Sequence, residues 1–383
     1  MRPHHRIFFI QFAVAFMLGA LVSRLPDLQH QFELSEGQLG LLLASMSTGV
    51  LLGLTFAAAP IEKFGARTMA FVTVFGSSFG FALVPWMPSA LAAAPAFFAA
   101  GILTGAFEVN ANIETDRHEA LLGRRIMSRA HGMWSVGFFL TALIGAGMRQ
   151  AGVAVGLHML VAFGLTLGAG LLVFPKIENA PRRIGTSSTA AELLTFPTLG
   201  LLPLCLIGAA PLLAEGASVD WSAIYMRDVF QAAPFVGGLA VTIFSLSIAA
   251  GRLFMDPVVD RYRPRFVAAG LLVATTVGLT LVVIAPHSLV ALVGFCVTGI
   301  GCSCVYPLAI SAAAARTDRP GPTNVAALGQ TTFVVFFAGP PLLGFIAEYA
   351  GIRFSYLAVI PVIVAALTTS RALSSQSKMG AGR

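Results

Sequence analysis

Charged residues are scarce in this sequence. Asp, Glu, Lys and Arg make up 11% of its 383 residues, and hydrophobic residues make up 57%. Ordinary globular domains carry roughly 25% charged residues. So low a charge content excludes an ordinary soluble domain and indicates a chain surrounded by an apolar medium.

Cysteine is also rare, and its placement argues against a metal or redox site. All four cysteines fall inside apolar runs, where cysteine behaves as a small hydrophobe. No histidine or carboxylate lies near Cys302 and Cys304 in sequence to complete a metal site. We therefore expect no metal and no cofactor.

Long apolar runs are what the sequence has in abundance. Each is about 20 residues long, which is enough for a helix to cross the roughly 30 Å hydrocarbon core of a bilayer. We place twelve predicted transmembrane helices at residues 7–23, 38–61, 68–86, 91–113, 127–147, 153–174, 199–219, 235–255, 266–285, 289–314, 325–347 and 354–370. The loops between them are too short for a separate catalytic domain.

The positive charges predict the orientation of these helices, because short loops rich in Lys and Arg stay in the cytoplasm. With the N-terminus inside, only Arg24, Arg149, Arg227 and Arg353 of the 24 Lys and Arg residues fall on the opposite side. Both termini are therefore predicted to be cytoplasmic, in a bacterial inner membrane. The net charge of +7 then reflects topology and contact with anionic lipid, and we expect no nucleic-acid partner. The first run lacks a cleavage site, so we expect it to be retained.

An acidic and basic loop signature occurs twice in the chain. The first copy runs from Pro60 to Arg67 and the second from Asp256 to Arg265, roughly half of the chain apart. Duplicated six-helix halves are an architecture of secondary transporters. The repeat predicts an N-terminal bundle at residues 1–175, a cytoplasmic linker at 176–197 and a C-terminal bundle at 198–383.

The twelve runs, the central linker and the duplicated signature resemble the major facilitator superfamily over nearly the whole chain. Three stretches, at residues 24–26, 123–135 and 213–222, are similar to its fucose-permease-like, YbjJ-type branch. The resemblance implies an all-α membrane protein with twelve transmembrane helices in two pseudo-symmetric six-helix bundles. It also implies transport by alternating access, in which the bundles rock around a central site.

In this superfamily the signature loops form a gate on the cytoplasmic side. A carboxylate at a helix end, followed by Lys or Arg, can pair with a neighbouring helix terminus and latch that side shut. The gate residues implied here are Glu62, Lys63, Arg67, Arg252, Asp256, Asp260 and Arg261. The first copy departs from the family pattern, with Glu62 in place of Asp. The alternative is that these charges only fix the topology.

A carboxylate inside a span costs about 2.5–3.5 kcal/mol on insertion scales and is therefore a functional candidate. Glu108 lies within the fourth run and shares a helix face with Gly101, Gly105 and Asn112. That face can form both a close helix seam and a polar lining. Glu108 can exchange a proton there, or it can be a hydrogen-bonded structural residue. Glu108 and Asn112 resemble the Glu-Asn pair of fucose permeases, whose glutamate takes part in proton coupling.

The chain departs from the fucose permeases at their second coupling carboxylate, where it has Val22. Coupling would therefore use Glu108 alone, or recruit Glu215 or His131. The matching stretch of the second half, residues 299–307, has no carboxylate. Coupling is thus predicted to be asymmetric and N-terminal. His131 can alternatively be a hydrogen-bonded packing residue.

Glu215 lies in the seventh run, where we expect Pro211 and Gly216 to interrupt the helix. Broken transmembrane helices expose backbone beside polar side chains and form midplane sites. Glu215 is therefore a candidate contact for substrate or proton. Trp221 and Tyr225 can be stacking or gating rings, or they can mark the membrane interface, where aromatic residues concentrate.

Neutral hydrogen-bonding groups and tryptophan faces suit a polar uncharged solute such as a sugar. The candidate substrate-binding residues are Gln11, Asn110, Asn112, Trp134, Asp220, Trp221, Tyr225, Tyr306 and Gln330. We therefore predict a proton-coupled secondary transporter of a small polar organic solute, which works as a monomer and is not an enzyme.

Other classes of function fit the sequence less well. Proton-driven drug efflux would favour a Gly-Pro signature in the fifth run, and residues 137–147 contain no proline. An exchanger of anions would place Arg or Lys in the middle of a span. A membrane-embedded enzyme would need clustered ligands or carboxylates with a nucleophile, and a non-transporting sensor is a further alternative. Drug efflux remains the main competing hypothesis.

Overall fold

The computed structural model describes residues 3–123, 126–176 and 195–374, and within these ranges the chain forms helices and no strands. Eleven of the described helical segments are long and apolar enough to cross a membrane, and Ile352–Thr368 is a shorter apolar helix. The chain divides into two compact units. The predicted linker at 176–197 falls mainly on residues 177–194, which lie outside the described residues.

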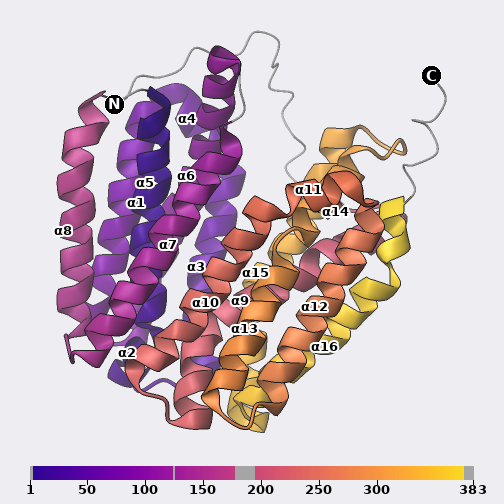
Figure 1. Cartoon of the computed structure of the whole chain (residues 1–383). Coiled ribbons are helices and arrows are strands. Elements are labelled where there is room, and N and C mark those ends of the chain that lie inside the picture. Colours follow the sequence, from indigo (N-terminus) through magenta and orange to yellow (C-terminus); the bar gives the residue numbers. More distant parts are fainter. Residues whose placement is uncertain (1–2, 124–125, 177–194, 375–383) are drawn as a thin grey trace. The chain divides into compact units, whose positions relative to one another are not determined.

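The first unit comprises Met1–Ser188 together with Ala233–Gly238. Four short helices, α2 (Leu25–Gln31), α4 (Ala58–Phe64), η1 (Val84–Trp86) and η2 (Phe174–Lys176), lie at the ends of its long ones. The long helices, coloured from indigo to magenta in Figure 1, are α1 (Pro3–Ser23), α3 (Glu36–Phe56), α5 (Ala66–Leu83), α6 (Ala90–Leu122), α7 (Met127–Gln150) and α8 (Val155–Val173).

The second unit comprises Thr189–Ala232 and Leu239–Arg383. Its helices are α9 (Leu202–Phe230), α10 (Pro234–Phe254, whose first turn groups with the first unit), α11 (Asp256–Arg261), α12 (Pro264–Ile284), α13 (Ser288–Cys302), α14 (Val305–Ala314), α15 (Gly321–Ala350), α16 (Ile352–Thr368) and η3 (Ser370–Ser374). The tenth predicted span is therefore divided between α13 and α14.

Glycines bring α3 and α6 into direct backbone contact. A Cβ added at Gly101 would lie 2.2 Å from the Met46 carbonyl oxygen, and one at Gly105 would lie 2.2 Å from that of Val50. Gly49 and Gly53 on α3 face α6 in the same way. Apolar tails provide no hydrophobic driving force between helices in a bilayer, so close packing of small residues holds such pairs together. The predicted close seam on the Gly101 and Gly105 face is present.

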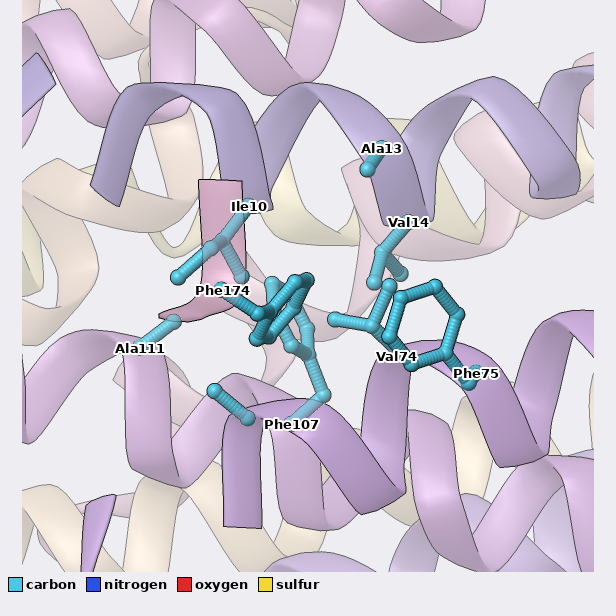
Figure 2. Packing of buried hydrophobic residues seen from close by; sticks show 9 residues of the cluster. Ile10, Ala13, Val14, Val74, Phe75, Phe107, Ala111 and Phe174 are labelled. Atoms are coloured by element: carbon cyan, nitrogen blue, oxygen red, sulfur yellow. The ribbon is translucent and has the colours of Figure 1, made fainter. Parts of the chain in front are cut away.

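The first unit also has an aromatic core where α1, α5, α6 and η2 meet (Figure 2). Phe107 of α6 is buried there beside Ile10 and Val14 of α1. The rings of Phe75 and Phe174 lie 5.0 Å apart between centroids, and the planes are tilted by 48°. This core fixes α6, which carries Glu108 and Asn112, against α1 and α5.

Some boundaries differ from the predicted spans because polar residues can continue a helix beyond the apolar run. α6 continues past the predicted end at residue 113, and Glu114 and Arg117 pair on it at 2.7 Å. It ends at Gly123, whose φ of 62° is left-handed and favours glycine. Gly65, with a φ of 80°, separates α4 from α5.

Candidate functional site

Glu108 and Asn112 form a polar pair on α6, inside a candidate membrane span. The Asn112 amide donates to Glu108 Oε1 at 3.1 Å, and both side chains are half-buried. Within the described part of the chain, no basic side chain forms an ion pair with Glu108. The carboxyl group is therefore held by a neutral donor one turn away.

Asn110, on another face of α6, holds the signature loop of the first unit. Its buried amide donates to the Ala66 carbonyl at 3.0 Å, at the first residue of α5. Ile61 of α4 is buried against α5 and α6 beside this bond. Glu62 and Lys63 remain exposed on α4. Asn110 thus ties the predicted gate to α6, and its predicted contact with substrate stays a prediction.

Gln11 is fully buried on α1, and neither its amide nitrogen nor its amide oxygen has a hydrogen-bond partner among the described residues. A buried amide without a partner costs free energy, on the order of 1–3 kcal/mol in proteins. Such a group indicates a place for a water molecule or for a polar ligand.

His131 and Trp134 are half-buried near the start of α7. The Trp134 ring stacks on Phe138 with 5.5 Å between centroids, and the Ser135 hydroxyl donates to the His131 carbonyl at 3.2 Å. The stacking therefore orients the Trp134 ring along α7.

In the second unit, the helix break occurs at the tenth span and not at the seventh, where it was predicted. α9 continues through Pro211 and Gly216 from Leu202 to Phe230, so the predicted interruption there is wrong. A proline removes one backbone hydrogen bond, and transmembrane helices can absorb that loss. Among the described residues of this unit, a helix ends and another begins inside a predicted span at Ser303 and Cys304, between α13 and α14.

Pro307 explains this break. Its ring would clash with the carbonyl of Ser303, four residues earlier, if the helix were continuous, and it has no N–H to give to that carbonyl. Arg252 of α10 supplies a donor instead, with its Nε 3.3 Å from the Ser303 oxygen. Gly251 permits the approach, because a Cβ there would lie 2.5 Å from Ser303 Cβ.

The same Arg252 faces Glu215 of α9, with 3.7 Å between Nη2 and Oε2. The side chain of Arg252 is 42% exposed and that of Glu215 is 24% exposed, so the pair is accessible and long for an ion pair. A predicted coupling residue and a predicted gate residue therefore meet at the helix break. The guanidinium is thus shared between a carboxylate and a backbone carbonyl.

An aromatic cluster lies toward the other end of α9. Tyr225 donates to the Val282 carbonyl at 2.5 Å, and its ring meets those of Phe295 and Tyr356 edge to face. Trp221 is buried, and its indole nitrogen has no hydrogen-bond partner among the described residues. Tyr225 is thus held within the packing of the unit, whereas the Trp221 N–H is available to a ligand or water. The half-buried Asp220 lies beside Trp221 in sequence.

Tyr306 and Gln330 lie nearer the start of α9. Tyr306 is hydrogen-bonded to Thr332 and packs beside Gly208, where an added Cβ would lie 3.3 Å from its ring. Gln330 Oε1 accepts a hydrogen bond from the Thr195 backbone at 2.7 Å. Gln330 therefore anchors the chain that leads into α9.

The loop between α14 and α15 holds the same segment of chain. Arg316 pairs with Asp318 at 2.8 Å and donates to the Gly200 carbonyl at 2.9 Å. Asp318 also accepts from Thr198 at 3.2 Å and from Asn324 at 3.1 Å. The Arg316 guanidinium holds the pKa of Asp318 well below its usual range, and Asp318 in turn raises the pKa of Arg316. We refer to this group as the Asp318 clamp.

Two of the remaining gate residues are basic and lie on the surface of their units. Arg67 and Arg261 are exposed, and the Arg261 guanidinium lies 5.7 Å from the centre of the Tyr262 ring. The side chains of Asp256 and Asp260 lie outside what the structure describes. The gate thus stays a prediction.

Two polar groups were not singled out from the sequence. Arg24 and Arg149 both pair with Asp27, at 2.7 and 2.9 Å, and Arg24 also donates to the Val153 carbonyl. Burial lowers the pKa of the Arg24 guanidinium, which Asp27 counteracts. Glu119 accepts from the Met127 backbone at 2.7 Å and so caps α7. Glu119 follows the apolar run of α6 and precedes the start of α7. A carboxylate in that position is the sequence signal that could have predicted the cap of α7.

Comparisons with known proteins agree with the fold. Residues 204–374 match the family model of the Major Facilitator Superfamily. The uncharacterized transporter y4wD of Sinorhizobium fredii is 29% identical over 343 residues, which cover 90% of each protein. A solved variant of the nucleoside transporter NupG aligns with a TM-score of 0.77 at 11% identity, over 96% of this chain and 98% of that one.

A solved D-xylose-proton symporter aligns with a TM-score of 0.68 at 17% identity, over 96% of this chain and 97% of that one. At such identities the two structures show the fold alone. The predicted fold class, an all-α membrane protein with the major facilitator fold, is confirmed. The family match over part of the chain and the curated relative support an integral membrane transporter.

Proposed function

We propose that this protein is a proton-coupled secondary transporter of a small polar organic solute, with the character of a sugar, in a bacterial inner membrane. It works as a monomer by alternating access, with both termini in the cytoplasm, and belongs to the fucose-permease-like branch. Its partners are the solute, protons and membrane lipid.

The pair of Glu108 and Asn112 carries this proposal. A carboxyl group inside a span is costly to keep charged, and here a neutral amide holds it at 3.1 Å. A group in this setting can gain and lose a proton during a transport cycle without breaking an ion pair. The fold places it on a helix that packs backbone to backbone with α3, so its position is fixed.

Unsatisfied neutral groups support a polar and uncharged solute. The buried amide of Gln11 and the buried indole N–H of Trp221 have no partners among the described residues. Both can exchange hydrogen bonds with hydroxyl groups of a solute. Two of the solved structures that share this fold are a nucleoside transporter and a xylose symporter, whose named solutes also carry hydroxyl groups.

The test is solute-driven proton movement in proteoliposomes that contain a pH-sensitive dye. Addition of the correct sugar or nucleoside should acidify or alkalinise the lumen with wild-type protein, and Glu108→Gln should abolish this signal. Glu108→Gln should retain exchange of labelled for unlabelled solute, because exchange needs no net proton transfer.

Glu33→Gln is the matched control, since Glu33 is exposed between α2 and α3 and should leave proton movement unchanged. A panel of amino acids and lipophilic cations tests the competing drug-efflux hypothesis. Full proton movement in Glu108→Gln would overturn the assigned role of Glu108, and a response to lipophilic cations alone would overturn the solute class.

A further inference from the structure

Asp220 is a carboxyl group inside a candidate membrane span of the second unit. It lies on α9, which continues without interruption from Leu202 to Phe230. The next charged residue on this helix is Arg227, about 10 Å further along the axis. Asp220 is half-buried, and among the described residues it has no ion pair and no hydrogen bond. An ionised carboxylate within a span is costly unless a cation or a donor compensates it.

The packing around Asp220 comes from the second unit itself. Ala217 and Ile224 lie three residues before and four residues after Asp220, so the three share one face of α9. Both are buried, and the Tyr356 hydroxyl of α16 donates to the Ala217 carbonyl at 3.0 Å. Asp220 also interacts electrostatically with Tyr356. This face of α9 therefore packs against α16.

The donors of this region are committed to backbone carbonyls. The Tyr356 hydroxyl is held as described, and that of Tyr225 donates to the Val282 carbonyl at 2.5 Å. Arg353, the arginine of α16, donates to two carbonyls at the end of α12, at 2.5 and 2.8 Å. Each of these donors already has an acceptor, and none of them bonds to Asp220.

The other titratable side chains on the helices that pack against α9 lie elsewhere. Cys296 and Cys302 of α13 contact hydroxyl groups of α10 and α12. Tyr306 of α14 packs beside Gly208, near the start of α9. The remaining ones lie in the first turn of α12, the last turn of α15 and η3, and are Arg265, Glu348, Tyr349 and Arg371. In the part of the chain that the structure describes, none of these groups pairs with Asp220.

Two other carboxyl groups inside the spans have partners. Glu215, also on α9, faces Arg252 at 3.7 Å, and Glu108 is held by the Asn112 amide at 3.1 Å. Asp220 has neither a cation nor a donor. The neutral acid, in which the carboxyl group carries its own proton, is therefore the form that suits this position.

We propose that Asp220 is a proton-binding site of the second unit, separate from the pair of Glu108 and Asn112, and that release of its proton at alkaline pH stops transport. On release, the O–H bond breaks, the proton passes to water and a carboxylate remains on the packed face of α9. That charge must be hydrated, which disrupts the packing of α9 against α16. The effect on transport rests on the function proposed above, whereas the bound proton does not.

Infrared spectroscopy of the full chain in lipid tests the bound proton directly, because a carboxylic acid and a carboxylate absorb at different frequencies. In mildly acid solution, the wild-type spectrum should contain a carboxylic acid band that is missing in Asp220→Asn. Asp228→Asn is the matched control, since Asp228 lies on the same helix and pairs with Arg227 at 2.6 Å. It should leave the band unchanged. An identical band in wild type and Asp220→Asn would overturn the proposal.

Exchange of labelled for unlabelled solute in proteoliposomes tests the effect on transport, since exchange needs no net proton transfer. Wild-type exchange should fall about tenfold for each pH unit once Asp220 ionises. Asp220→Asn, which mimics the neutral acid, should keep exchanging at alkaline pH, and Asp228→Asn should follow the wild type. The same pH profile for wild type and Asp220→Asn would overturn the effect on transport. If no sugar or nucleoside exchanges at any pH, the proposed function fails, and the infrared band still decides whether Asp220 holds a proton.

Discussion

The seam between α3 and α6 makes a sharp prediction about Gly105. A methyl group added there would lie 2.2 Å from the Val50 carbonyl oxygen and 2.9 Å from the Leu54 nitrogen. Both are backbone atoms of α3, so no side chain can rotate out of the way. Gly105→Ala must therefore push the two helices apart by roughly 1 Å to restore an ordinary contact.

The energetic cost follows from overpacking, which destabilises cores by about 1–3 kcal/mol. Gly164 of α8 provides a matched control, because nothing lies within 4 Å of a Cβ added there. Gly164→Ala should stabilise the helix by roughly 0.5–1 kcal/mol. The two variants should thus differ by about 1.5–4 kcal/mol, or at least about 3 °C in melting temperature for units of this size.

Thermal unfolding in detergent, followed by circular dichroism, measures this difference. The same displacement moves Glu108, one turn along α6, and misplacement by about 1 Å can cost on the order of 100-fold in a rate. Solute-driven proton movement should therefore fall sharply in Gly105→Ala and stay normal in Gly164→Ala. Equal melting temperatures for the two variants would refute the close contact between α3 and α6.

Two other interactions make predictions of their own. Asp318→Asn should loosen the chain before α9, and amide hydrogen exchange at residues 195–200 should become faster. Folding depresses the pKa of Asp318, so the clamp is fully present above the usual aspartate pKa of about 3.9 and is lost as the pH falls through the lowered pKa. Exchange in the wild-type protein should therefore accelerate only in acid. Arg252→Met should destabilise the protein by about 1–3 kcal/mol because it leaves the Ser303 carbonyl without its Arg252 donor. Pro307→Ala supplies the missing N–H, so Arg252→Met should cost less in the Pro307→Ala background, and an equal cost in both backgrounds would contradict the assigned contact.

The fold could be predicted from the sequence because a bilayer leaves few choices. Every backbone group within the hydrocarbon must be paired, so a long apolar run forms a helix. The ends of the helices were predicted less accurately, since α6 continues through Glu114 and Arg117 beyond the apolar run. Hydropathy marks where a helix crosses the membrane and says little about where the helix ends.

Part of the candidate site could also be predicted, where partners lie close in sequence. Glu108 and Asn112 are one helical turn apart, and their hydrogen bond follows from that spacing alone. The bond from Asn110 to Ala66 joins residues far apart in the chain. Such a contact depends on how α5 and α6 pack, which one sequence does not reveal.

The break in the tenth span also depends on helix packing, which could not be predicted from the sequence. Both Pro211 and Pro307 lie in apolar runs, and the interruption was predicted at Pro211 and Gly216. In the structure the helix breaks at Pro307, and Arg252 binds the freed Ser303 carbonyl and faces Glu215. Which proline interrupts its helix depends on the surrounding packing, which the sequence alone does not reveal. At Pro307 the packing brings Arg252 to the freed carbonyl, and the same residue connects the predicted coupling carboxylate of the second unit to its helix break.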